Sequence, residues 1–126
     1  MHELSITQSI LDISLDKAKA AQAYKINKIS LVIGELTGFV SECIEFYFDF
    51  LSKDSIADGA TLNFKLVAGE LRCRKCSTTF NPKDIMWVCP TCQSRSVEVI
   101  GGRELYIESI EVETNGDKSP TKYSGS

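Results

Sequence analysis

The chain lacks any long apolar stretch. Its longest uninterrupted apolar run covers residues 85–89, whereas a membrane-spanning helix needs about 20 such residues. It also lacks basic residues near its start, because Glu3 is acidic and the first basic side chain is Lys17. A secretory leader would begin with a basic segment followed by an apolar one. These absences exclude a membrane-spanning protein and predict a cytoplasmic location.

Positive charge is not in excess either. The 14 Lys and Arg residues face 17 Asp and Glu residues, which gives a net charge of -3. Nonspecific binding to phosphates requires a positive field, so the composition argues against nucleic acid as a partner. With 126 residues, of which 43% are hydrophobic, the chain has the size and composition of one small folded domain that carries a smaller module.

Hydrophobic periodicity predicts two helices and three strands. Ser5 is expected to cap the first helix, which would start at Ile6 and run to about Tyr24. Ser41 is expected to cap the second, which is apolar nearly all round and should therefore be extensively covered and supply the aromatic core. Cys43, on that second helix, is expected to be a buried core thiol. The predicted second helix and strands are residues 41–52, 26–34, 60–68 and 105–112.

The order of these elements predicts an α+β fold, in which two helices pack on a three-stranded sheet and a zinc-ribbon-like module is inserted before the last strand. Residues 1–69 plus 101–113 would form the α/β domain, which carries His2, and residues 70–100 the inserted module, which carries the paired cysteines. The polar segment 114–126 is expected to be a disordered tail.

Four of the five cysteines form two matched pairs. Cys73 and Cys76 are separated from Cys89 and Cys92 by twelve residues, a spacing that lets two knuckles close on one tetrahedral ion. Thiolates are soft ligands that suit Zn(II), and a module of this size has too little apolar surface to fold without metal. A four-cysteine site leaves no open position for water, so a structural zinc is expected rather than a catalytic one.

Two other classes of function compete with this interpretation. A zinc ribbon is also used as an adaptor for nucleic acid or protein, and residues 70–96 carry five basic against two acidic side chains. The resulting charge of +3 falls to about +1 once four thiolates and one Zn(II) are counted, which is weak for a phosphate-binding face. A thiol-disulfide enzyme would use a single CxxC pair at a helix N-terminus.

His2 is the only histidine, and it directly follows Met1. Its bulk should prevent excision of Met1, so the α-amine stays adjacent. The imidazole and the backbone nitrogen of His2 close a six-membered chelate, and the Met1 amine or the Glu3 amide closes a five-membered one. Such nitrogen donors are preferred by square-planar Ni(II) or Cu(II). The alternative is a solvated side chain at a frayed end.

Four motifs taken together resemble one family. Met1-His2-Glu3 ahead of a helix, the turn Ile33-Gly34-Glu35, the spacing CxxC-x12-CxxC and the strand at residues 107–112 occur in the order found in the HypA family of hydrogenase maturation factors. The resemblance covers residues 1 to about 113.

This resemblance implies a nickel metallochaperone that is not an enzyme. It would hold Ni(II) as transient cargo at Met1, His2 and Glu3 and keep structural Zn(II) at Cys73, Cys76, Cys89 and Cys92. Its expected partners are the GTPase HypB and the large subunit of [NiFe]-hydrogenase, with urease accessory proteins in some organisms. Some family members place histidines beside the zinc cysteines, and this chain has none there. Water, the Glu3 carboxylate or a partner protein would supply the fourth nickel ligand.

Overall fold

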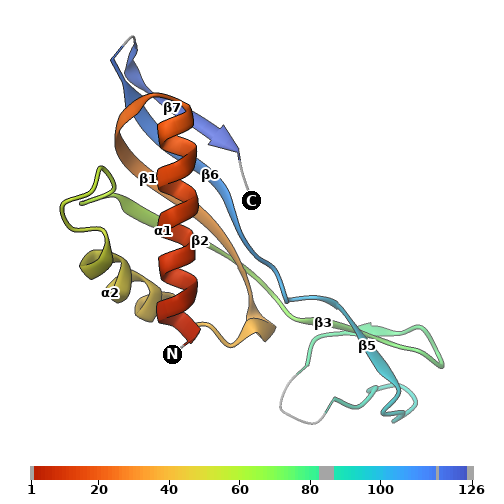
Figure 1. Cartoon of the computed structure of the whole chain (residues 1–126). Helices are drawn as coiled ribbons and strands as arrows, with labels where there is room; N and C mark the ends of the chain where they lie inside the picture. Colours follow the sequence, from red (N-terminus) through yellow and green to blue (C-terminus); the bar gives the residue numbers. More distant parts are fainter. Residues whose placement is uncertain (1, 83–86, 116, 125–126) are drawn as a thin grey trace. The chain divides into compact units, whose positions relative to one another are not determined.

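The computed structural model describes residues 2–82, 87–115 and 117–124 (Figure 1). It contains two α-helices, one 3-10 helix and seven strands in that part of the chain. The elements in chain order are α1 His2–Ala20, β1 Ala23–Gly34, η1 Glu35–Thr37, α2 Ser41–Leu51, β2 Thr61–Val67, β3 Glu70–Cys73, β4 Thr79–Phe80, β5 Val97–Gly101, β6 Leu105–Thr114 and β7 Asp117–Ser124.

The chain forms two compact units, which we call the helical unit and the cysteine unit. The helical unit comprises Met1–Val32, Phe39–Lys65 and Tyr106–Ser126. The cysteine unit comprises Ile33–Gly38 and Leu66–Leu105. The second compact unit therefore includes the end of β1 and the 3-10 helix in addition to the cysteine-rich stretch. The assignment of nickel and zinc to separate domains stays a prediction.

The principal sheet has the strand order β2-β1-β6-β7. Figure 1 shows α1 in front of its strands, and α1 packs against α2. The buried side chains of α1 recur at helical spacing, at Thr7, Ile10, Leu11, Ser14 and Ala18, so one face of the helix is covered. The expected α+β class with two helices is confirmed. No helix in the described ranges is long and apolar enough to cross a membrane.

The sheet has a fourth strand that the sequence did not indicate. Asp117–Ser124, inside the segment expected to be a disordered tail, forms β7 and pairs antiparallel with β6. The prediction failed because an edge strand is held by backbone hydrogen bonds along one side and needs no strong hydrophobic pattern. Pro120 is compatible with this position, since proline is tolerated in edge strands.

The first helix begins earlier than expected. It includes His2, so Ser5 lies inside α1 and does not cap it. The Thr7 hydroxyl donates a hydrogen bond to the Glu3 carbonyl oxygen one turn back. The residues before Ser5 include Glu3 and Leu4, both good helix formers, so nothing in the local sequence stops the helix at the serine.

The second helix is much less covered than its composition suggested. Val40, and not Ser41, is its N-cap residue. Only Ile44 and Phe48 are buried, while Phe46 and Phe50 are 70% and 68% exposed. Cys43 is exposed too, which contradicts the expected core thiol. One stripe of α2 faces the core, and its remaining aromatic side chains lie on the surface.

The cysteine unit contains an antiparallel sheet of order β4-β3-β5. The segment Ile33–Gly38 is tied to this unit by backbone hydrogen bonds from Gly34 N to Glu104 O (2.6 Å) and from Leu36 N to Gly102 O (2.7 Å). Gly102 has a φ of 105°, a conformation that favours glycine. These bonds hold the end of β1 within the same unit as the cysteines.

Candidate metal centre

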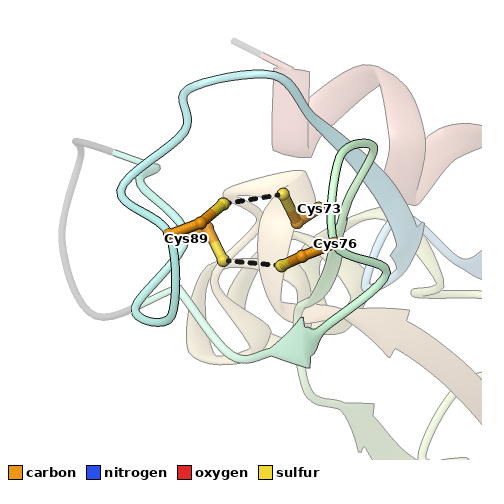
Figure 2. Close-up of side chains that lie close together, drawn as sticks. Cys73, Cys76 and Cys89 are labelled. Carbon is orange, nitrogen blue, oxygen red and sulfur yellow. Dashed lines mark hydrogen bonds between the residues drawn. The ribbon is translucent and has the colours of Figure 1, made fainter.

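Four cysteine sulfurs meet in the cysteine unit. Cys73 is the last residue of β3, and Cys76 lies in the turn that follows it. Cys89 and Cys92 belong to a second turn, after residue 86. The Sγ atoms of all four lie within 4.8 Å of one another. Figure 2 shows Cys73 and Cys76 facing Cys89 across the centre.

The two turns have the same backbone geometry. Lys75 N donates to Cys73 Sγ and Thr91 N donates to Cys89 Sγ, both at 3.4 Å. Each turn also closes with a hydrogen bond from the first cysteine's N–H to a carbonyl oxygen five residues on, at Thr78 and at Ser94. Backbone N–H groups directed at sulfur stabilise a thiolate. The equivalent position four residues after each first cysteine has a positive φ, at Ser77 (63°) and Gln93 (60°).

The sulfur positions fit a tetrahedral metal ion. Cys73 Sγ lies 3.6 Å from Cys92 Sγ, and Cys76 Sγ lies 3.5 Å from Cys89 Sγ. With a Zn–S bond of about 2.3 Å, the sulfurs of a tetrahedral four-thiolate site lie about 3.8 Å apart. Cys73 and Cys89 are buried, while Cys76 and Cys92 are exposed. The four cysteines predicted from the spacing are thus brought together as a group able to hold a metal.

The thiols of the cluster have different proton affinities. The side-chain hydroxyl and backbone N–H of Thr78 lower the pKa of Cys76 to about 6. The backbone N–H of Cys76, followed by that of Lys75, lowers the pKa of Cys73. For Cys92 a backbone hydrogen bond from Ser94 lowers the pKa, but hydrogen bonding to Cys73 and burial outweigh it and raise the value to about 11. The contacts with Thr78 therefore favour the thiolate form of Cys76.

Side chains outside the cysteine motif support this unit. Glu35 Oε1 accepts a hydrogen bond from Gly69 N at 2.8 Å, and Asn81 Nδ2 donates to Gly69 O at 2.6 Å. Both backbone polar groups of Gly69 are thus satisfied by side chains distant in sequence. Glu104 Oε1 accepts from Gly102 N at 2.8 Å. No local spacing pointed to the contacts of Glu35 and Asn81 with Gly69, because Gly69 lies 34 and 12 residues away from them.

The residues predicted to hold nickel are only partly described. Met1 lies outside the described residues, and so does the side chain of His2. The backbone of His2 forms the first residue of α1, and Glu3 lies in its first turn. The first four N–H groups of an α-helix have no acceptor within the helix. The amides of His2 and Glu3 therefore have no helical partner.

Comparison with known proteins agrees with this architecture. Residues 1–112 match the family described as hydrogenase/urease nickel incorporation, metallochaperone, HypA. The chain is 48% identical over 119 residues to a hydrogenase maturation factor HypA of Dehalococcoides mccartyi, which covers 94% of this chain and 100% of that relative. It is 43% identical over 114 residues to the HypA of Caldanaerobacter subterraneus, with 90% and 100% covered.

A solved structure shares the fold. The solution structure of the Ni metallochaperone HypA from Helicobacter pylori matches with a TM-score of 0.63 and 28% identity, over 90% of this chain and 98% of that one. Sequence family, curated relatives and fold thus agree over nearly the whole chain. The chain belongs to the HypA family of metallochaperones for hydrogenase and urease nickel incorporation.

Proposed function

We propose that this chain carries Ni(II) on Met1, His2 and Glu3 and delivers it during maturation of [NiFe]-hydrogenase, and of urease where that enzyme is present. Its membership in a nickel-incorporation family is the observation that carries this proposal. As a carrier it performs no catalysis, and nickel is its cargo. The GTPase HypB, the hydrogenase large subunit and urease accessory proteins are the proposed partners, and a cytoplasmic location stays a prediction.

The start of α1 supports the nickel assignment chemically. The chain's only histidine stands at the first helical position. Its backbone nitrogen is free of any helical hydrogen bond, so binding a metal there breaks no bond of the helix. The partial positive charge at a helix N-terminus also favours loss of an amide proton. Imidazole, amide and amine nitrogens together form the donor set that square-planar Ni(II) prefers.

The nickel site requires an additional ligand. In a plane, the His2 amide has two cis neighbours, the imidazole and either the Met1 amine or the Glu3 amide. The fourth donor would be the Glu3 carboxylate, water or a group of the partner protein. A site completed from outside exchanges its metal readily, which suits transfer to a client enzyme.

We assign Zn(II) to Cys73, Cys76, Cys89 and Cys92 as a structural ion. The sulfur separations support a tetrahedral ion of that size, and thiolates select Zn(II) over harder ions. Four protein ligands leave no position for a substrate or an activated water. In this proposal the zinc stabilises the cysteine unit and takes no part in nickel chemistry.

Metal analysis of the purified full chain after nickel loading tests the proposal. We expect about one Ni per wild-type chain, because the donors form one square-planar set. The His2→Ala variant should lose most of the nickel and keep its zinc. A Lys19→Ala variant, altered at the opposite end of α1, serves as the matched control and should retain both metals. Full nickel stoichiometry in His2→Ala would reject the site.

A further inference from the structure

Among the described residues of the helical unit, the two most exposed large hydrophobic side chains lie on the outward stripe of α2. Phe46 and Phe50, one helical turn apart, are 70% and 68% exposed. Residues four apart lie on the same side of a helix, so the two rings form one patch. The Phe46 ring lies edge-on to Tyr47, with ring centroids 5.6 Å apart. Exposed aromatic side chains grouped in this way are typical of protein interaction surfaces.

One flank of this patch is acidic. Helical spacing places Glu42, Glu45 and Asp49 in one row along α2, beside the two phenylalanines. All three are exposed. The sequence of α2 contains no basic residue. In the part of the chain that the structure describes, none of the three carboxylates forms an ion pair, and Glu42 accepts only a hydrogen bond from Ser41 Oγ.

The exposed phenylalanines and the row of carboxylates on α2 are energetically unfavourable in the free chain unless a partner covers them. Two phenyl groups in water give up the stabilisation that burial provides, and three like charges on one helix repel each other. The inner stripe of α2, with Ile44 and Phe48 buried, already fixes the helix to its unit. The aromatic side chains of the outer stripe are therefore not required for packing within the helical unit.

We propose that α2 docks into an apolar groove of a partner protein whose border carries Lys or Arg residues. Phe46 and Phe50 enter the groove, and the carboxylates of Glu42, Glu45 and Asp49 face the basic border. This is the helix-in-groove mode of recognition, in which side chains at i and i+4 are the anchors. The opposite charges increase the association rate and fix the orientation of the complex. The inference rests on the proposed function, because the partner is the protein that supplies or receives nickel.

Binding measurements with the two purified partners proposed above, the GTPase and the hydrogenase large subunit, test this inference. We expect Phe46→Ser/Phe50→Ser to weaken binding to at least one of them tenfold or more. Leu66→Ser is the matched control, since Leu66 is 69% exposed but lies on β2; its affinity should stay within about twofold of the wild type. Glu45→Gln/Asp49→Gln should reduce the dependence of the association rate on salt.

Four further readouts, namely circular dichroism, zinc content, oligomeric state and nickel stoichiometry, make the result decisive. Unchanged circular dichroism and zinc content establish that the phenylalanine variant is folded. Wild-type affinity of that variant for both partners would overturn the proposal, as would failure of the wild-type chain to bind either one. A wild-type dimer that becomes monomeric in the variant would show that a second copy covers the stripe, which also overturns it. Nickel stoichiometry in His2→Ala does not depend on α2. It therefore tests the proposed carrier function independently of the docking proposal.

Discussion

At the scale of single residues, Gly34 is the described glycine at which an added Cβ would lie closest to neighbouring atoms. A Cβ added there would lie 2.1 Å from the carbonyl oxygen of Gly102 and 2.6 Å from Arg103 N. Both are backbone atoms, which move only with the chain that carries them. Gly34 accordingly lets two segments of the cysteine unit approach more closely than any side chain permits.

We predict that Gly34→Ala lowers the free energy of unfolding by about 3 kcal/mol, because the clash with backbone forces the two segments apart. Gly101→Ala is the matched control in the same unit, since its Cβ would make only ordinary van der Waals contacts, with Glu70 Cβ at 3.7 Å and Ala68 O at 4.0 Å. Urea unfolding of the zinc-loaded proteins measures the difference. Equal stability of the two variants would show that the close approach at Gly34 is not maintained in solution.

At the scale of secondary-structure elements, α2 allows a direct comparison of a buried and an exposed aromatic side chain. Phe48 is 1% exposed, whereas Phe50 on the same helix is 68% exposed. We predict that Phe48→Ala costs about 3 to 5 kcal/mol, because it leaves a cavity in the core. Phe50→Ala should change stability by less than about 0.5 kcal/mol. Thermal unfolding checks both values, and a large loss in Phe50→Ala would mean that the outer stripe is covered within the isolated chain.

The same helix shows what the sequence can and cannot predict. Its existence and bounds followed from periodicity, and the cysteine cluster followed from spacing, because both signals are local. Coverage of Phe46 and Phe50 did not follow, since hydrophobicity says which residues favour burial but not whether another element lies over them. Glu35 was found as part of a motif, yet its bond to Gly69 joins residues 34 apart. Such contacts depend on the assembled fold.

The predictions for the start of α1 and for β7 were wrong because both features depend on more than the residues that the prediction used. A capping residue marks a helix end only if the preceding residues leave the helix, and those before Ser5 do not. The backbone of β7 is ordered by pairing with β6, for instance Ile110 opposite Tyr123. Edge pairing of this kind leaves little trace in the pattern of apolar residues.

At the scale of the whole molecule, the two units differ in how they are stabilised. Among the described residues, the helical unit has a large apolar core that includes Ile26, Ile29 and Phe48. Among the described residues of the cysteine unit, the buried apolar ones are Ile33, Leu71, Cys73 and Cys89. This described core is too small to offset the conformational entropy of the 46 residues of the unit. Structural zinc binding contributes about 10 to 16 kcal/mol in small zinc domains, so a bound ion would add substantially to the stability of this unit.

We therefore predict that removing metal with a strong chelator unfolds the cysteine unit and leaves the helical unit folded. Hydrogen exchange followed by NMR should show loss of protection in β3 and β5, while amides of α1 and the first half of β1 stay protected. Adding Zn(II) back should restore β3 and β5. Protection of β3 that survives full metal removal would contradict a structural role for the ion.

The chain crosses between its two units several times, and this affects what happens when the backbone is cut. The backbone passes from one unit to the other at residues 32/33, 38/39, 65/66 and 105/106. A protease cut between Lys65 and Leu66 would leave two fragments, and each fragment would contain residues of both units. The two fragments could dissociate only if both units unfolded. The cleaved protein should therefore run as one molecule under native conditions and separate into two fragments only when it is denatured.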